Sequence, residues 1–202
     1  MNPFRHLLFI LRQRRAGSRV SFSAYLKGYE RIVLGQGCKI HANASVDASR
    51  SPGVHFGNKV TLNRYAYIQG GMGGVRLGDR VEINNFSIVN GTGGVDIGDD
   101  TLIGPGVRII SYQHRHARSM TIREQSVAAL PIRIGNDVWI GANAVILAGA
   151  DLSMVHKICV ETHPDVLGDK VLSEMFAGLV AKGFALDFSL IRKNVFFFHR
   201  VA

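Results

Sequence analysis

The sequence predicts an all-β protein, a parallel β-helix, from three observations: a six-residue repeat, a heavy load of glycine and one long interruption of the repeat. In each hexad an aliphatic or aromatic residue at position i is followed at i+4 by a small or β-branched residue. The hexads that obey both positions are Leu34/Cys38, Ile40/Ala44, Phe56/Val60, Leu62/Ala66, Leu77/Val81, Ile83/Ser87, Ile97/Thr101, Ile103/Val107, Ile134/Val138, Ile140/Ala144 and Ile146/Ala150. Six residues suit one short strand and one corner, so three hexads make a triangular coil with the i residues stacked inside.

Glycine supports this interpretation. The 202 residues include 23 glycines and 5 prolines, which in an ordered chain indicates many tight corners. Glycine follows the i residue repeatedly, as Gly35, Gly57, Gly78, Gly98, Gly104, Gly135 and Gly141. These positions are therefore expected at the corners of the coils.

The interruption predicts a loop. Coil starts at Leu34, Phe56, Leu77 and Ile97 are separated by 22, 21 and 20 residues, whereas the next start, Ile134, follows after 37. That gap is one coil plus about nineteen residues, since three hexads make one coil. We expect residues 111–129 to leave the coil as an extruded loop, where function tends to concentrate in a rigid scaffold.

Three segments are predicted. Residues 1–30 are expected to form a basic N-terminal helix and cap, residues 31–153 the β-helix, and residues 154–202 an atypical C-terminal segment. The repeat fails after Ser153, and residues 171–184 fit a helix better than a strand. The apolar run near the N-terminus is too short to span a bilayer and fits either a helix on an anionic membrane or a capping helix.

Composition narrows the partners. A formal net charge of +9 favours anionic ones. Nucleic acid is disfavoured, because basic residues beyond the N-terminus are dispersed and not interleaved with aromatic residues. Cys38 and Cys159 show neither metal spacing nor a disulfide framework, which favours a cytoplasmic protein, with membrane association left open.

The hexads, the loop and the segment I-G-N-D-V-W-I-G-A-N-A-V-I-L-A-G at 134–149 resemble the hexapeptide-repeat acyltransferases, whose coils are left-handed. Over residues 34–153 the chain is most similar to the maltose and galactoside O-acetyltransferases and to O-acetyltransferases of bacterial surface polysaccharides. The resemblance implies a left-handed parallel β-helix, a homotrimer with active sites between neighbouring coils, and no metal. It also implies transfer of an acetyl group from acetyl-CoA to a saccharide hydroxyl.

The resemblance also assigns roles to residues. His114, at the start of the loop, matches the general base that would deprotonate the acceptor hydroxyl, with His116 as the reserve. Asn85 matches an acceptor-binding asparagine, and Asn90 lies near an acidic acceptor contact of the family. Both asparagines fit structural ladders at coil corners as well. We expect direct transfer without an acyl-enzyme, because no cysteine or activated serine lies near His114 in the sequence.

Two residues are candidates for the CoA side. Ala142 occupies the position whose backbone N–H binds the thioester carbonyl in the family. Trp139 either flanks the pantetheine groove or packs at a coil edge. Glu124, in the loop, could orient an imidazole, although a solvated loop carboxylate is the favoured interpretation.

Two other classes of protein remain as alternatives. A γ-carbonic-anhydrase-like enzyme needs three histidines converging on zinc, but no histidine follows His114 or His116 by five residues. A scaffold or inactive relative would keep the coil and lose the CoA-binding end. The departure of the chain from the family after Ser153 favours this second alternative.

Overall fold

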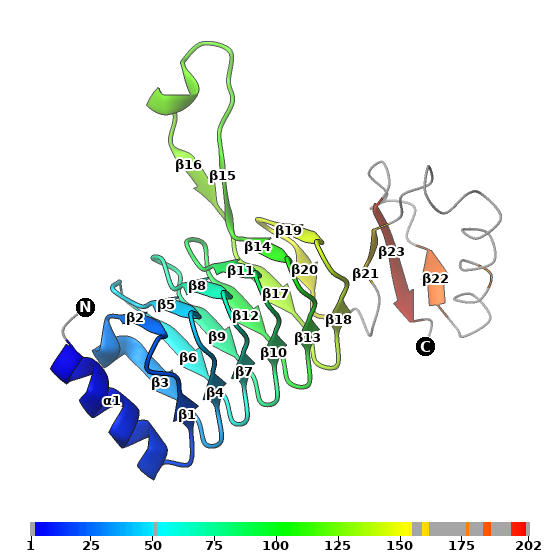
Figure 1. Cartoon of the computed structure of the whole chain (residues 1–202). Helices are drawn as coiled ribbons and strands as arrows, with labels where there is room; N and C mark the ends of the chain where they lie inside the picture. Colours follow the sequence, from blue (N-terminus) through cyan, green and yellow to red (C-terminus); the bar gives the residue numbers. More distant parts are fainter. Residues whose placement is uncertain are drawn as a thin grey trace.

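Three sheets wind around a common axis in the computed structural model (Figure 1). The structure describes residues 3–50, 52–154 and 177, and the backbone of strands at 159–161, 184–186 and 195–200. The chain passes repeatedly from sheet A to sheet B to sheet C, and successive strands within each sheet pair in parallel. The predicted parallel β-helix is confirmed.

The strands are short because each spans one side of a triangular coil. Sheet A begins with β1 (Arg19–Val20), β4 (Lys39–Ile40), β7 (Thr61–Leu62), β10 (Glu82–Ile83), β13 (Leu102–Ile103) and β18 (Trp139–Ile140). Sheet B contains β2 (Tyr25–Lys27), β5 (Ser45–Asp47), β8 (Tyr67–Gln69), β11 (Ile88–Asn90), β14 (Arg108–Ile110) and β19 (Val145–Leu147). Sheet C contains β3 (Ile32–Leu34), β6 (Val54–Phe56), β9 (Val75–Leu77), β12 (Val95–Ile97), β17 (Ile132–Ile134) and β20 (Asp151–Leu152).

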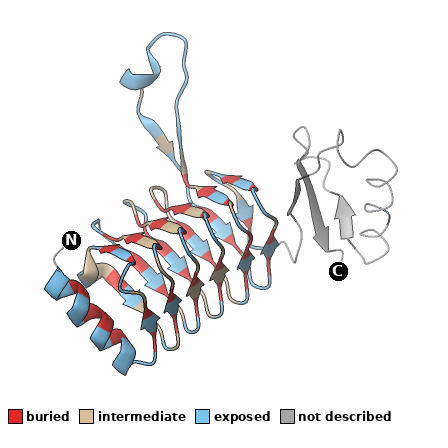
Figure 2. Ribbon diagram, in the orientation of Figure 1, coloured by how far each residue is buried: buried red, intermediate tan, exposed pale blue. Residues whose placement is uncertain are grey.

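The i and i+4 residues of the hexads line the interior (Figure 2). All the predicted pairs are buried, apart from Leu34 and Ala150, which are partly buried against the core. Where the i+4 residue is polar, it bonds to the next coil: the Ser87 hydroxyl donates to the Gly104 carbonyl at 2.7 Å, and the Thr101 hydroxyl to Gly135 at 3.0 Å. These bonds let a hydroxyl occupy a dry corner without an unsatisfied group.

Glycine at i+1 is required by the close approach of successive coils. A Cβ on Gly98 would lie 2.3 Å from the Oδ1 atom of Asn136 and 2.6 Å from the Gly135 carbonyl carbon. At Gly35 it would lie 2.4 Å from the Gly57 carbonyl oxygen. Neither contact can be relieved without moving a backbone, so these corners accept only glycine.

The N-terminal helix caps the β-helix. Helix α1 (Pro3–Arg15) buries His6, Phe9, Ile10 and Gln13 against the first coil. The His6 ring bonds to the Tyr29 hydroxyl at 3.1 Å and to the Phe22 carbonyl at 3.0 Å. Tyr29 belongs to a 3₁₀ turn (Tyr29–Arg31) before β3. The predicted N-terminal helix is thus present, and one of its faces packs against the first coil.

The β-helix starts earlier than predicted. The sequence predicts residue 31 as its first residue, whereas β1 pairs with β4, and β2 with β5. Val20 and Ala24, buried in the core, are an i/i+4 pair that marks this coil. The first coil was missed because the exposed residues Phe22 and Tyr25 obscure the alternation.

The predicted loop is an extruded β-hairpin. The spacing of 37 residues is confirmed by the pairing of Ile97 with Ile134 in sheet C. Between them, β15 (Tyr112–His114) pairs antiparallel with β16 (Val127–Ala129), and a 3₁₀ turn (Ile122–Glu124) lies near the tip. Figure 1 shows this hairpin projecting away from the coils.

The C-terminal helix predicted over 171–184 lies mostly outside the described residues. Within that range the structure describes Ala177, in a helical conformation, and Phe184, the first residue of β22. Elsewhere in the C-terminal segment it describes strands, which lie beyond β18 in the order β21 (Cys159–Glu161), β23 (Val195–Arg200) and β22 (Phe184–Leu186). Strand β21 continues the parallel ladder, whereas β23 runs antiparallel to both β21 and β22. A search of the described part of the chain finds no helix with the length and apolar character needed to cross a membrane.

Candidate functional site

The predicted site residues lie at or beside two corners of the coil. The A–B corner comprises the segments between sheets A and B, including 84–87, 104–107 and 141–144. The B–C corner comprises the segments between sheets B and C, including 91–94, the hairpin 111–131 and 148–150. A strand of three residues, about 10 Å long at ~3.3 Å per residue, separates the two corners within one coil.

His114 lies on the extruded hairpin at the B–C corner. It is the last residue of β15, opposite Val127, and its side chain is exposed. The Tyr112 and His114 rings lie edge to face, with centroids 6.3 Å apart. No hydrogen bond joins the His114 imidazole to another described residue. His116 is also exposed, in the irregular segment beyond the strand.

The tip of the hairpin is held by its own side chains. The Gln125 amide accepts from the Ala117 backbone N–H at 2.7 Å and donates to the Ala117 and Met120 carbonyls at 3.0 Å each. The Glu124 carboxylate accepts from the backbone N–H and hydroxyl of Thr121, and these bonds lower the pKa of Glu124. Glu124 therefore caps the 3₁₀ turn, and within the described part of the chain it bonds to no imidazole.

The root of the hairpin is fastened to the preceding coil. The buried Ser111 hydroxyl donates to the Asn90 carbonyl at 2.6 Å and accepts from the Gly93 N–H at 2.8 Å. The Asn90 amide group donates to Gln69 at 2.7 Å, while its oxygen accepts from the backbone and hydroxyl of Thr92. The structure thus brings Asn90 next to the root of the hairpin, with its side-chain amide bonded to Gln69 of the preceding coil and to Thr92 of its own coil.

Asn85 and Ala142 share the A–B corner. The Asn85 carbonyl accepts from Gly106 at 2.9 Å, and the Pro105 carbonyl accepts from Asn143 at 2.9 Å, so the two residues are stacked two coils apart. Both are exposed. Among the described residues, no acceptor is found for the Ala142 N–H. Within one chain, the structure does not bring this corner together with His114.

The last coils expose apolar side chains around Ala142. Trp139 precedes the corner on β18, and Val145 and Leu147 follow it on β19; these three side chains are 58%, 54% and 54% exposed. Trp139 therefore does not pack into the coil. Its exposed ring is available to line a groove at this corner.

A stacked aromatic pair beside Asn85 was not predicted. Tyr65 and Phe86 lie on adjacent coils of the A–B corner, with parallel rings whose centroids are 5.2 Å apart. Both adopt a left-handed backbone, at φ 60° and 62°, which is rare for aromatic residues. The Asn43 amide donates to the Tyr65 hydroxyl at 3.0 Å. The sequence does contain a signal for this pair. At the equivalent corner position other coils have asparagine, Asn43 and Asn143, whereas these two coils have an aromatic residue.

No cluster of three or more histidine, cysteine, aspartate or glutamate side chains suited to a metal ion occurs in the part of the chain that the structure describes. Cys38 is buried as a free thiol whose Sγ atom lies 3.1 Å from the Gly57 carbonyl oxygen. Burial raises the pKa of this thiol. Cys38 therefore has a structural role at a coil corner.

A comparison with known protein families finds the six-residue repeat of the coil in one of them. Residues 131–152 match the family described as the hexapeptide repeat of succinyl-transferase. This match covers β17 to β20, including the A–B corner with Ala142. Over these residues the chain is similar to that family, and the match lies within the coil whose hexads repeat every six residues.

Its relatives include proteins named as acetyltransferases. The chain is 30% identical, over 60% of its length, to Rv3034c of Mycobacterium tuberculosis, whose name assigns it provisionally as an acetyltransferase. It is 27% identical, over 67% of its length, to WbbJ of Escherichia coli K12, whose name assigns it provisionally as a lipopolysaccharide biosynthesis O-acetyl transferase. The resemblance to hexapeptide-repeat acyltransferases is thereby confirmed. The matched region covers 39% of the mycobacterial protein and 71% of WbbJ.

A solved structure is similar at lower sequence identity. A mutant of perosamine N-acetyltransferase from Caulobacter crescentus, in complex with CoA and GDP-perosamine, aligns with a TM-score of 0.48 and 19% identity. The alignment covers 78% of this chain and 63% of that one. At this identity the alignment identifies no shared residue role.

Proposed function

We propose that the protein transfers an acetyl group from acetyl-CoA to a hydroxyl of a saccharide acceptor. One observation carries the proposal: the regular coil is interrupted by a hairpin that presents an exposed histidine, His114, to solvent. A histidine suits removal of a hydroxyl proton near neutral pH. The names of the relatives support acetyl transfer, and that of WbbJ supports a saccharide hydroxyl as its acceptor.

In the proposed reaction, the His114 imidazole takes the proton of the acceptor hydroxyl as its oxygen attacks the thioester carbonyl carbon. The Ala142 N–H donates to the carbonyl oxygen while that oxygen carries negative charge. The carbon–sulfur bond then breaks, and the imidazolium returns the proton to the sulfur of CoA. The Ala142 N–H, which has no acceptor among the described residues, is available for this role.

We propose that each active site is shared between neighbouring chains of a homotrimer. His114 and Ala142 belong to different corners, so the hairpin of one chain would reach the A–B corner of the next. The hairpin also exposes Met120, Ile122 and Val127, which a neighbouring chain could cover. In this arrangement, the exposed Trp139, Val145 and Leu147 line the groove for the pantetheine chain.

The charge of the hairpin supports binding of an anionic donor. Arg115, Arg118 and Arg123 lie between β15 and β16, where the Glu124 carboxylate is engaged by Thr121. The phosphates of CoA carry several negative charges, so a basic hairpin raises the local donor concentration. Asn85 and the Tyr65–Phe86 pair are proposed to contact the acceptor from the A–B corner.

Purified protein incubated with acetyl-CoA and a panel of saccharides tests the proposal. We expect one free CoA thiol to form per acetylated acceptor detected by mass spectrometry. Treatment of the product with hydroxylamine separates the two acceptor chemistries, because it cleaves an acetyl ester and leaves an acetamide intact. Absence of acetyl-CoA binding by calorimetry would favour a scaffold that has lost the CoA-binding end.

The variant Phe86→Gly tests the acceptor contact. Glycine relieves the left-handed backbone strain of about 1 kcal/mol, which offsets loss of a ring stack of similar size. We therefore expect an unchanged melting temperature and a KM for the acceptor raised about three- to tenfold. Lys59→Gly, at another left-handed corner position, is the control. An unchanged KM in Phe86→Gly would remove the aromatic pair from the acceptor site.

A further inference from the structure

Helix α1 has a second apolar face that the capping role does not explain. Closing the end of the β-helix uses one face, which is buried. The opposite face exposes four apolar side chains at helical spacing: Phe4 (68% exposed), Leu7 (44%), Leu8 (50%) and Leu11 (46%). An outward stripe of this kind lowers solubility unless something covers it.

The stripe is bordered by positive charge. Helix α1 contains Arg5, Arg12, Arg14 and Arg15, and no acidic residue. The nearest acidic side chain along the chain, Glu30, pairs with Arg31 at 2.8 Å. Long arginine side chains beside an apolar face can lie along that face and place their guanidinium groups in the phosphate layer of a lipid surface.

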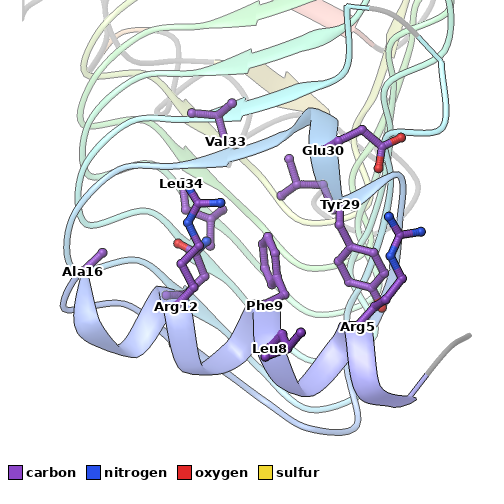
Figure 3. Close-up of a pocket in the computed structure, with 11 residues that line it drawn as sticks. Arg5, Leu8, Phe9, Arg12, Ala16, Tyr29, Glu30, Val33 and Leu34 are labelled. Atoms are coloured by element: carbon purple, nitrogen blue, oxygen red, sulfur yellow. The ribbon is translucent and has the colours of Figure 1, made fainter.

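A groove continues this surface onto the first coil. It has a volume of about 590 Å³ and lies between α1 and β3, with Phe9, Val33 and Leu34 among its apolar lining. In Figure 3, the side chains of Arg5 and Arg12 rise on either side of Phe9 toward β3. A groove with an apolar lining between two guanidinium groups can accept a molecule that has an apolar chain and an anionic headgroup.

From these contacts we propose that α1 docks the N-terminal end of the β-helix onto an anionic lipid bilayer. The apolar stripe inserts at the level of the headgroups, and the arginines bind lipid phosphates. Charge complementarity selects a lipid surface of negative charge, because each arginine at such a surface strengthens binding about fivefold. A helix of 13 residues is about 20 Å long, so it lies on the bilayer and does not cross it.

Sedimentation of the full chain with vesicles tests the proposal. Vesicles of phosphatidylcholine with about 30% phosphatidylglycerol are compared with vesicles of phosphatidylcholine alone, at low and high salt. We expect binding to the anionic vesicles only, weakened by salt. The double variant Leu8→Gln/Leu11→Gln should bind the anionic vesicles at least about tenfold more weakly, because each substitution removes an apolar side chain that would be buried in the bilayer. Leu102→Gln, at a 46% exposed leucine of β13, is the matched control and should bind like the wild type.

A second pair of variants separates charge from insertion. Arg14→Gln/Arg15→Gln should weaken binding about 25-fold, whereas Arg14→Lys/Arg15→Lys should retain it. Circular dichroism melting of every variant reports whether α1 still caps the coil. The proposal is overturned if folded wild-type protein stays in the supernatant, or if the leucine variants bind normally. It is equally overturned if those variants lower the oligomeric mass, because a second copy would then cover α1.

Discussion

Replacement of His114 by alanine is expected to lower the turnover of acetyl transfer by about 10²- to 10⁴-fold, the usual contribution of a general base. The imidazole is exposed at the end of β15, and its removal leaves the Ser111 bonds and the Gln125 bracing of the hairpin intact. Acetyl-CoA affinity should therefore be retained. Steady-state release of CoA thiol and calorimetric binding are the two measurements.

His116→Ala is the control for this variant, since the two histidines share the hairpin and its exposure. Its turnover should stay within a few-fold of the wild type. If turnover falls only a few-fold in His114→Ala and falls further in His116→Ala, then His116 is the general base. If neither loses more than a few-fold, the hairpin does not supply the base.

Ile103→Ala is expected to destabilise the fold by about 2–5 kcal/mol. Ile103 is fully buried on β13 and stacks between Ile83 and Ile140 in the neighbouring coils. Both partners are held by parallel ladders, so the coil cannot collapse into the cavity. For a chain of this size, the melting temperature should fall by about 5–15 °C.

Leu102→Ala is the matched control, because Leu102 precedes Ile103 on the same strand and is 46% exposed. Its melting temperature should stay within about 2 °C of the wild type, as expected for a surface substitution. Equal losses from both variants would show that stability does not reside in the stacked interior, which would contradict the account of the coil.

The periodic part of the fold was predictable because each hexad repeats the same physical requirement. An aliphatic residue such as Ile83 must fill the interior, and a glycine such as Gly98 must allow the next coil to approach. The first coil is not evident in the sequence because the exposed Phe22 and Tyr25 obscure the alternation around Val20 and Ala24. The six-residue pattern therefore predicts the stacked coils. The N-terminal end of the β-helix depends instead on contacts between distant residues, such as those of His6 with Tyr29 and Phe22.

The candidate site was less predictable than the coil. The position of His114 on a hairpin followed from one irregular spacing, but its distance from Ala142 depends on which corner each residue occupies. The stack of Tyr65 on Phe86 joins residues far apart in the sequence and needs a left-handed backbone, which aromatic residues rarely adopt. The bond of Asn90 to Gln69 likewise forms only when neighbouring coils are in register.

A pair of inactive variants tests the shared active site most directly. Ala142→Pro removes the N–H, and Pro105 already occupies this corner position in the preceding coil, so the backbone accommodates proline there. We expect Ala142→Pro alone to lose about 10²- to 10³-fold in turnover. Melting temperatures of the single variants verify that both fold.

Activity of trimers assembled from equal amounts of His114→Ala and Ala142→Pro chains is the deciding measurement. In a shared site, an intact hairpin from one chain meets an intact A–B corner from the next at about one interface in four. The mixture should recover about a quarter of wild-type turnover. Mixed trimers as inactive as either parent would contradict a site shared between chains.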